Sequence, residues 1–211
     1  PLPSLDRRSR QLTRKTVSAE IPDWTRERPQ RFWDPARRLL RAIRRWQACG
    51  PGPLGRLARK RWALSHRFWS AVTSIEVPLK TPIAGGLLLP HPTGVVVHPD
   101  TVIGPNCILF QNVTLGTNYG RRGAPKLGGH VDVGPGAVVL GPVTIGDHAL
   151  IAANAVVLAD VPVGAVVAGA PARVIRYRNG AGPERGPAHG PAHSPERGPA
   201  DVSGDDPADA P

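Results

Sequence analysis

One histidine stands where an otherwise regular sequence pattern is interrupted. His91 is at the centre of LLLPHPTG (87–94), between Pro90 and Pro92. Imidazole is the side chain that takes up a proton near neutral pH and returns it, which is what transfer to or from a hydroxyl group requires. A histidine between two prolines is also typical of a purely structural turn. The residue type therefore suits general acid–base chemistry, and its position alone does not establish it.

The surrounding residues follow a period of six. An aliphatic side chain recurs at every sixth position, and glycine often follows it directly. The column comprises Val97, Ile103, Leu109, Leu115, Leu127, Val133, Val139, Ile145, Ile151, Val157 and Val163. An α-helix has a period of 3.6 and a strand a period of 2, whereas a hexapeptide β-helix has a period of six. Three hexads close one triangular coil, so we expect the column to point inward and stack from coil to coil.

Two segments depart from this repeat. Two extra residues separate the inward positions Leu89 and Val97, and His91 lies inside that insertion. The stretch 117–126 has no Val, Leu or Ile, and Arg121 occupies its column position. We expect this stretch to leave the coil as a loop that reaches over a neighbouring subunit. The flat outer faces of a solenoid favour closed threefold association, with sites between subunits.

The basic residues are concentrated before the repeat. The whole chain has a net charge of +11, and 18 of its 27 Lys and Arg lie in residues 1–72, against five acids. We expect 1–32 to be loosely ordered and 33–75 to be α-helical. Asp34-Pro35 predicts the start of the first helix, with an acid at the N-cap and proline at the first helical position.

The second predicted helix is basic and rich in tryptophan. It is expected to present Leu57, Trp62, Leu64, Trp69 and Val72. A helical pair of this kind is typical of a cap that packs on the next domain. Weak contact with an anionic membrane surface and nucleic-acid binding are two alternatives, and no nucleic-acid-reading motif accompanies the charge.

Composition narrows the class of protein further. No run approaches the ~18 apolar residues of a membrane-spanning helix, and no signal-peptide pattern is present. Cys49 and Cys107 are too few and too far apart for a disulfide framework or a Cys-rich zinc site. We interpret both as free thiols of a cytoplasmic protein. Residues 177–211 are near-repeats of Gly, Pro, Ala and charged residues, which predicts a disordered tail.

Residues 76–176 resemble the serine acetyltransferase branch of the hexapeptide-repeat acyltransferases. The shared motifs are LLLPHPTGVVV, VIGPNCILFQNVTLG, APKLGGHVDVGPGAVVLGPVTIGDHALIAANAVVLADVP and AGAPARVI. The resemblance implies a left-handed parallel β-helix over 76–176. It also implies transfer of an acetyl group from acetyl-CoA, as co-substrate, to an acceptor hydroxyl, without a metal.

The resemblance also assigns roles to single residues. His91 would take the proton of the acceptor hydroxyl and protonate the departing thiolate, and Glu76, fifteen residues earlier, would orient the imidazole. Backbone N–H groups of Gly116 and Thr117 are candidate donors to the oxyanion. The candidates for contact with CoA are four small residues for the pantetheine arm and one cation for the phosphates: Pro135, Gly136, Ala152, Ala153 and Arg173.

Two positions differ from the family's pattern. The residue before the catalytic histidine is usually an acid that contacts the substrate, and here it is Pro90. The loop usually reads Arg-His-Pro, and here it reads GAP (123–125), with Arg122 as the candidate replacement contact for a carboxylate. Serine O-acetylation, as in cysteine biosynthesis, remains the main prediction. Acetylation of a sugar hydroxyl in polysaccharide biosynthesis is the alternative that these losses favour.

A third alternative belongs to a different class of protein. The same solenoid occurs in non-catalytic trimeric scaffolds and zinc carbonic anhydrases. His130 and His148 are eighteen residues apart and would stack along one edge, but zinc needs a third ligand and His98 is out of register. We therefore interpret the pair as an exposed edge column. The expected assembly is a homotrimer or a dimer of trimers that does not bind nucleic acid.

Overall fold

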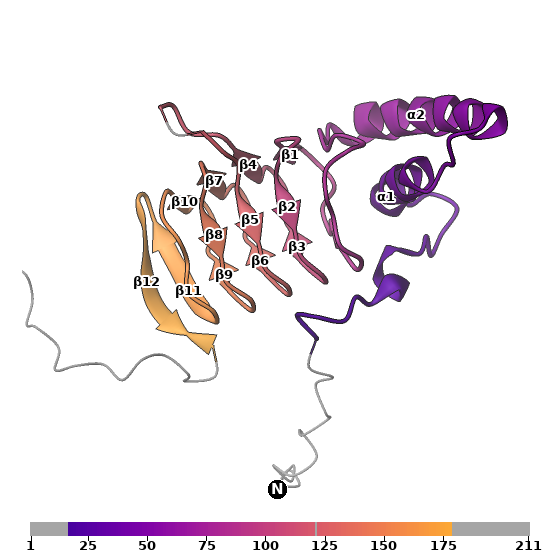
Figure 1. The fold of residues 1–211 in the computed structure, drawn as a ribbon. Helices are drawn as coiled ribbons and strands as arrows, with labels where there is room; N and C mark the ends of the chain where they lie inside the picture. Colours follow the sequence, from indigo (N-terminus) through magenta and orange to yellow (C-terminus); the bar gives the residue numbers. More distant parts are fainter. Residues whose placement is uncertain (1–16, 121, 179–211) are drawn as a thin grey trace, which may run out of the picture.

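The computed structural model describes residues 17–120 and 122–178. A short 3-10 helix and two α-helices precede a stack of short strands, which forms the rest of the described chain (Figure 1). The strands are β1 (Val96–Val97), β2 (Val102–Ile103), β3 (Ile108–Leu109), β4 (Thr114–Gly116), β5 (Lys126–Leu127), β6 (Asp132–Val133), β7 (Val138–Leu140), β8 (Thr144–Ile145), β9 (Leu150–Ile151), β10 (Val156–Val157), β11 (Ala165–Gly169) and β12 (Ala172–Tyr177).

The strands make the three sides of a solenoid. The first sheet has the order β1-β4-β7-β10, the second β2-β5-β8, and the third β12-β11-β9-β6-β3. Successive strands along the chain belong to successive sheets, and the pairs between coils are parallel. This is the parallel β-helix expected from the period of six, in the left-handed form that the family resemblance implies.

The pairings confirm both departures from the repeat. Val97 pairs with Leu115, one regular coil of eighteen residues later. The bridge from Glu76 to Val96 spans twenty residues, so the first coil carries the two extra residues around His91. Leu115 pairs with Val139, a coil lengthened by six residues, because the loop after β4 leaves the stack.

The prediction was wrong for the last member of the aliphatic column. Val163 is 61% exposed, whereas Val161 is buried and pairs with Ile145. The final coil is two residues shorter than the regular one, which moves the inward position from 163 to 161. The other members of the column are buried, and each contributes roughly 1.5–3 kcal/mol through the burial of its side chain.

The first helix covers one end of the solenoid. Helix α1 (Pro35–Gln47) begins as predicted, because the Asp34 carboxylate accepts a hydrogen bond from the backbone N–H of Arg37. Its apolar stripe is buried in the common core: Ala36, Leu39, Leu40, Ala42 and Ile43. This helix is the cap that the sequence predicts.

The second helix does not share that role. In α2 (Pro53–Thr73) only Thr73 is buried. Of the residues that we expected it to present, Leu57, Leu64 and Val72 are exposed and the two tryptophans are half-buried. Figure 1 shows α2 at the margin of the molecule, next to α1. Leucines therefore line the outer side of this helix.

Residues 18–27, which we call the strap, are not loosely ordered as expected. They include the 3-10 helix η2 (Trp24–Glu27) and run along the corner between the second and third sheets. The side chain of Asn106 accepts a hydrogen bond from the Asp23 N–H and donates to the carbonyls of Ser18 and Ile21. These hydrogen bonds hold the strap against the corner, because its large apolar residues Ile21 and Trp24 are largely exposed.

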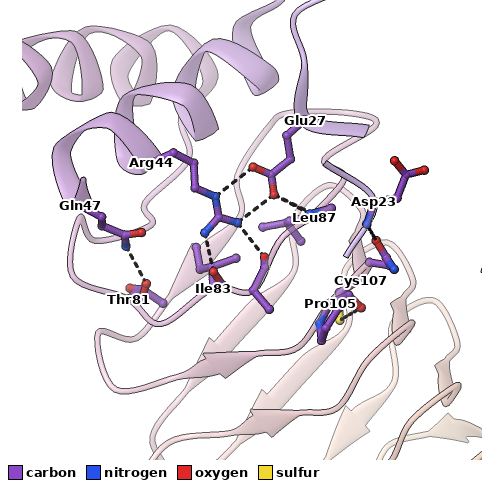
Figure 2. Close-up of polar contacts among 12 residues, drawn as sticks. Asp23, Glu27, Arg44, Gln47, Thr81, Ile83, Leu87, Pro105 and Cys107 are labelled. Carbon is purple, nitrogen blue, oxygen red and sulfur yellow. Dashed lines mark hydrogen bonds and ion pairs between the residues drawn. The ribbon is translucent and has the colours of Figure 1, made fainter. Parts of the chain in front are cut away.

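A buried ion pair fixes the C-terminal end of the strap (Figure 2). The carboxylate of Glu27 is 2.8 Å from the guanidinium of Arg44 and also accepts from the N–H groups of Gly86 and Leu87. Arg44 donates to the backbone carbonyls of Ile83 and Ala84. The pair therefore joins the strap, α1 and the first coil.

An antiparallel hairpin closes the other end of the solenoid. Strand β12 pairs antiparallel with β11, which lies parallel to β9.

Within residues 17–120 and 122–178, no helix is long and apolar enough to cross a membrane.

Candidate active site

His91 lies at the corner where the third sheet passes into the first. The chain leaves the third sheet after Leu88, which bridges to Ile108, and enters the first sheet at β1. The imidazole is exposed, and its ring centre is 6.3 Å from that of Phe110, one coil further on. The two inserted residues thus present this side chain to solvent beside a half-buried aromatic ring.

Glu76 lies in the segment that pairs with β1. Its N–H donates to the carbonyl of Val95, and its carbonyl accepts from the N–H of Val97. Two positions earlier, the Ser74 carbonyl accepts from the N–H of Gly94. The backbone therefore brings Glu76 alongside the segment that follows His91. Among the described residues, no hydrogen bond or ion pair joins the Glu76 carboxylate to the imidazole, so its orienting role stays a prediction.

Replacing this carboxylate tests that role. We expect Glu76→Gln to lower kcat for acetyl transfer by about tenfold to a hundredfold, because a hydrogen bond to a charged partner contributes roughly 1.5–3 kcal/mol. The reason is loss of the negative charge that stabilises the imidazolium form. Initial rates of CoA release would be compared with those of Glu76→Asp, which keeps the charge. Equal rates for Glu76→Gln and the parent protein would exclude the orienting role.

The candidates for contact with pantetheine stack along the same corner as His91. Pro135 and Gly136 follow β6, and Ala152 and Ala153 follow β9 one coil later. The carbonyl of Pro135 accepts from the N–H of Asn154, which joins the two turns. A side chain at Gly136 (φ +67°) would lie 2.2 Å from the Asn154 amide oxygen, so the close stacking of turns requires glycine.

Arg173 continues this line at the end of the solenoid. The N–H of Ala152 donates to the Val167 carbonyl, and the next residue, Ala168, pairs with Arg173 across the hairpin. The guanidinium is exposed and, among the described residues, donates to the adjacent Ala172 carbonyl. The structure therefore places His91 and all five candidates for contact with CoA along one edge of the solenoid.

The remaining site candidates lie at the opposite end of the first sheet. Gly116 ends β4 and pairs with Leu140, and Thr117 is exposed at the start of the loop. Arg122 lines a hollow inside this loop together with Asn118 and Gly123. These residues and His91 lie at opposite ends of the strands of the first sheet. Within one chain they are therefore not next to the imidazole.

A second hollow, of about 420 Å³, lies beside the loop that carries His91. It is lined on one side by Leu88, Pro90 and Pro92 and on the other by residues that precede or begin α1, namely Gln30, Arg31, Trp33, Asp34 and Arg37. Sequence reasoning missed these polar residues. Asp34 already serves as the helix cap, and nothing in the sequence connects residues 30–37 with 88–92.

His130 and His148 stack along one edge as predicted, but they are not exposed as expected, because the two rings contact each other. Their Nδ1 atoms are 2.8 Å apart and both rings are partly buried. Only one proton fits between the two facing nitrogens, so both rings cannot be fully protonated in this arrangement. Burial lowers the pKa of His130, opposed by the carboxylate of Asp132, while His148, Arg178 and Arg26 lower it further.

This lowered pKa predicts a loss of stability in acid. The unfolded chain binds the proton more readily, so the contribution of His130 is retained above its ordinary pKa of about 6.5 and is lost as the pH falls through the lower folded value. Asparagine suits the φ of +53° at this position. We expect His130→Asn to lose less unfolding free energy than the parent protein between about pH 7.5 and about pH 5. Urea unfolding measures the difference, with His98→Asn as the control.

The two cysteines are free thiols. Burial raises the pKa of Cys107 to about 12, so this thiol is not a nucleophile near neutral pH. Within the part of the chain that the structure describes, no three His, Cys, Asp or Glu side chains form a group that could hold a metal ion. The His130–His148 pair therefore lacks a third ligand there.

Comparison with known proteins agrees with the fold. Residues 124–159 match the family model described as bacterial transferase hexapeptide (six repeats). A serine acetyltransferase of Synechococcus elongatus is 40% identical over 111 residues, which cover 52% of this chain and 45% of that protein. The chain spans about half the length of the curated relatives that it matches.

Solved structures extend the likeness to about two thirds of the chain. A soybean serine acetyltransferase complexed with serine superposes with a TM-score of 0.55 and 32% identity, covering 67% of this chain and 56% of that one. A serine acetyltransferase in complex with CoA gives a TM-score of 0.57 and 28% identity, covering 68% and 57%. By sequence and by fold, the solenoid of this chain is therefore similar to those of serine acetyltransferases.

Proposed function

We propose that this chain is an acetyl-CoA-dependent serine O-acetyltransferase, which converts L-serine and acetyl-CoA to O-acetylserine and CoA. The observation that carries the proposal is the single edge on which His91 and the five candidates for contact with CoA stack. The soybean relative complexed with serine and the relative in complex with CoA support the two substrates.

The arrangement supports one mechanism. The acceptor hydroxyl attacks the thioester carbonyl while His91 Nε2 or Nδ1 takes its proton. The negative charge that develops on the carbonyl oxygen is stabilised by backbone N–H donors, for which Gly116 and Thr117 are the candidates. When the C–S bond breaks, the imidazolium returns the proton to the thiolate of CoA. General-base catalysis of this kind contributes about 10²–10⁴ in rate.

We further propose that the active unit is a homotrimer, alone or as a dimer of trimers. Gly116, Thr117 and Arg122 lie one sheet width from His91 on the same chain, so the complete site needs these residues from a neighbouring subunit. In a closed trimer, the corner of one subunit that carries His91 would lie against the end of the first sheet of the next subunit, which carries Gly116, Thr117 and Arg122. Acetyl-CoA is an intracellular metabolite, and we propose a cytoplasmic location and a role in cysteine biosynthesis.

Transfer to a sugar hydroxyl is the second candidate. Pro90 lines the hollow beside His91 where the family places an acid, and the loop has Gly123 and Ala124 in place of an arginine and a histidine. These substitutions remove two contacts to an amino-acid substrate and leave the histidine and the CoA edge unchanged. Arg122 and Arg31 are the cations available near the two hollows for a carboxylate.

One assay separates the two candidates. CoA release from acetyl-CoA would be measured with serine, homoserine and a panel of monosaccharides as acceptors. The proposal expects turnover with serine above the rate of thioester hydrolysis. Turnover with sugars alone would establish the second candidate, and no turnover with any acceptor would overturn acetyl transfer altogether.

A further inference from the structure

We propose that helix α2 docks on the surface of an anionic lipid membrane, which goes beyond the acetyl transfer proposed above. The helix is 21 residues long and only its last residue, Thr73, is buried. Its outer side is not covered by another described element, and Figure 1 shows it at the margin of the molecule. The first observation is therefore a long helix with one free side.

That free side carries apolar side chains along most of its length and is interrupted by the exposed Arg61. Exposed apolar side chains follow one another after three, seven, four and four residues, spacings that place them on one stripe of the helix. The stripe consists of Leu54 (82% exposed), Leu57 (67%), Leu64 (71%), Phe68 (53%) and Val72 (41%). A stripe of this length is unusual on the surface of a single chain and marks a site of contact.

Aromatic residues extend the stripe at its C-terminal half. Trp33 packs edge-on against Trp69 with ring centres 5.6 Å apart, and Phe68 packs against the same ring at 5.0 Å. Phe32 lies beneath the Arg38 guanidinium, 5.4 Å from its ring centre, and is 89% exposed. Exposed aromatic rings beside arginine are typical of protein surfaces at the headgroup level of a membrane.

The charge of the helix selects the lipid. Helix α2 contains five basic residues and no acid. Arg56, Lys60 and Arg67 are exposed next to the apolar stripe, and their side chains make no hydrogen bond or ion pair with any described residue. An apolar stripe with free cations along its border fits an anionic leaflet, where the rings and leucines enter and the cations bind phosphates.

The same charges argue against two other occupants. A second copy of α2 would place five cations against five cations, and like charges across an interface oppose association. A nucleic acid would bind the cations but would leave the leucines and Phe68 in water. An anionic lipid surface would contact both the cations and the apolar side chains.

Vesicle sedimentation with the full chain tests the proposal. The parent protein is expected to bind vesicles of phosphatidylcholine and phosphatidylglycerol in equal parts and not vesicles of phosphatidylcholine alone. Arg56→Gln, Lys60→Gln and Arg67→Gln combined should weaken binding about a hundredfold, because each cation contributes roughly fivefold near an anionic surface. Leu57→Ser, Leu64→Ser and Phe68→Ser combined should weaken it at least tenfold.

A matched control removes three charges elsewhere. Arg28, Arg41 and Arg45 are exposed and lie outside α2, and their combined change to Gln should alter vesicle binding by less than about fivefold. An equal loss in this control would overturn the proposal, because it would show a diffuse effect of charge. Absence of vesicle binding would also overturn it. In that case, loss of self-association in the leucine variant would indicate a second copy of the chain as the occupant. Loss of binding to duplex DNA in the basic variant would indicate a nucleic acid. CoA release by all variants should equal that of the parent, so failure here is separate from failure of the proposed function.

Discussion

Replacing His91 by alanine is expected to lower kcat for acetyl transfer by about 10²–10⁴, the range that a positioned general base contributes. The side chain is exposed and makes no hydrogen bond to another described residue, so its loss removes a proton acceptor without opening a cavity. KM for acetyl-CoA should change little, because the other candidates for contact with CoA are intact. Single-turnover measurement of CoA release, together with steady-state rates, distinguishes the two parameters.

The control for this variant is His98→Ala. His98 is half-buried one turn after β1, and its Nδ1 lies 3.9 Å from the Asp100 carboxylate. The same change of residue type there should leave kcat within about threefold of the parent value. If His91→Ala retained more than about a tenth of the activity, general-base catalysis by this residue would be excluded.

The second large effect concerns stability. Glu27→Ala should lower the free energy of unfolding by about 3–5 kcal/mol, because removal of one partner leaves the other charge of a buried pair uncompensated. Glu27 is 7% exposed, and the variant also leaves the N–H groups of Gly86 and Leu87 without their acceptor. Urea unfolding followed by circular dichroism measures this difference.

Glu20→Ala is the control on the same segment. The side chain of Glu20 is exposed, and its loss should change the unfolding free energy by less than about 0.5 kcal/mol. The double variant Glu27→Ala/Arg44→Met should be less destabilised than the sum of the single variants, because neither charge is then left alone. A cost below about 1 kcal/mol for Glu27→Ala would show that the ion pair does not anchor the strap.

The solenoid was predictable because its signal is local and repeated. Each coil buries the same column, so a residue such as Leu115 or Ile145 is placed by its phase alone. A shift of two residues in the phase located the first insertion, and the arginine at column position 121 located the second. The phase failed at Val163 because the final coil is shortened by two residues, and a single late shift leaves no later member to reveal it.

Features held by single polar contacts were not predictable. The attachment of the strap depends on Asn106 and on Glu27, and each contact joins residues about sixty to ninety positions apart. The hollow beside His91 has the same origin, because residues 30–37 reach it only through the docking of α1. The face of α2 was ambiguous from sequence, since leucine, phenylalanine and tryptophan occur around most of that helix.

The path of the strap imposes an order on the folding of the chain during its synthesis. The carbonyl of Ala19 lies so close to Gly129 that a side chain there would overlap it at 1.8 Å, and Asn106 binds three other positions of the strap. During synthesis residue 19 leaves the ribosome more than a hundred residues before its partner. The strap, which is synthesised first, must therefore stay exposed to solvent until the coils have formed. It docks on the corner between the second and third sheets as a late step of folding.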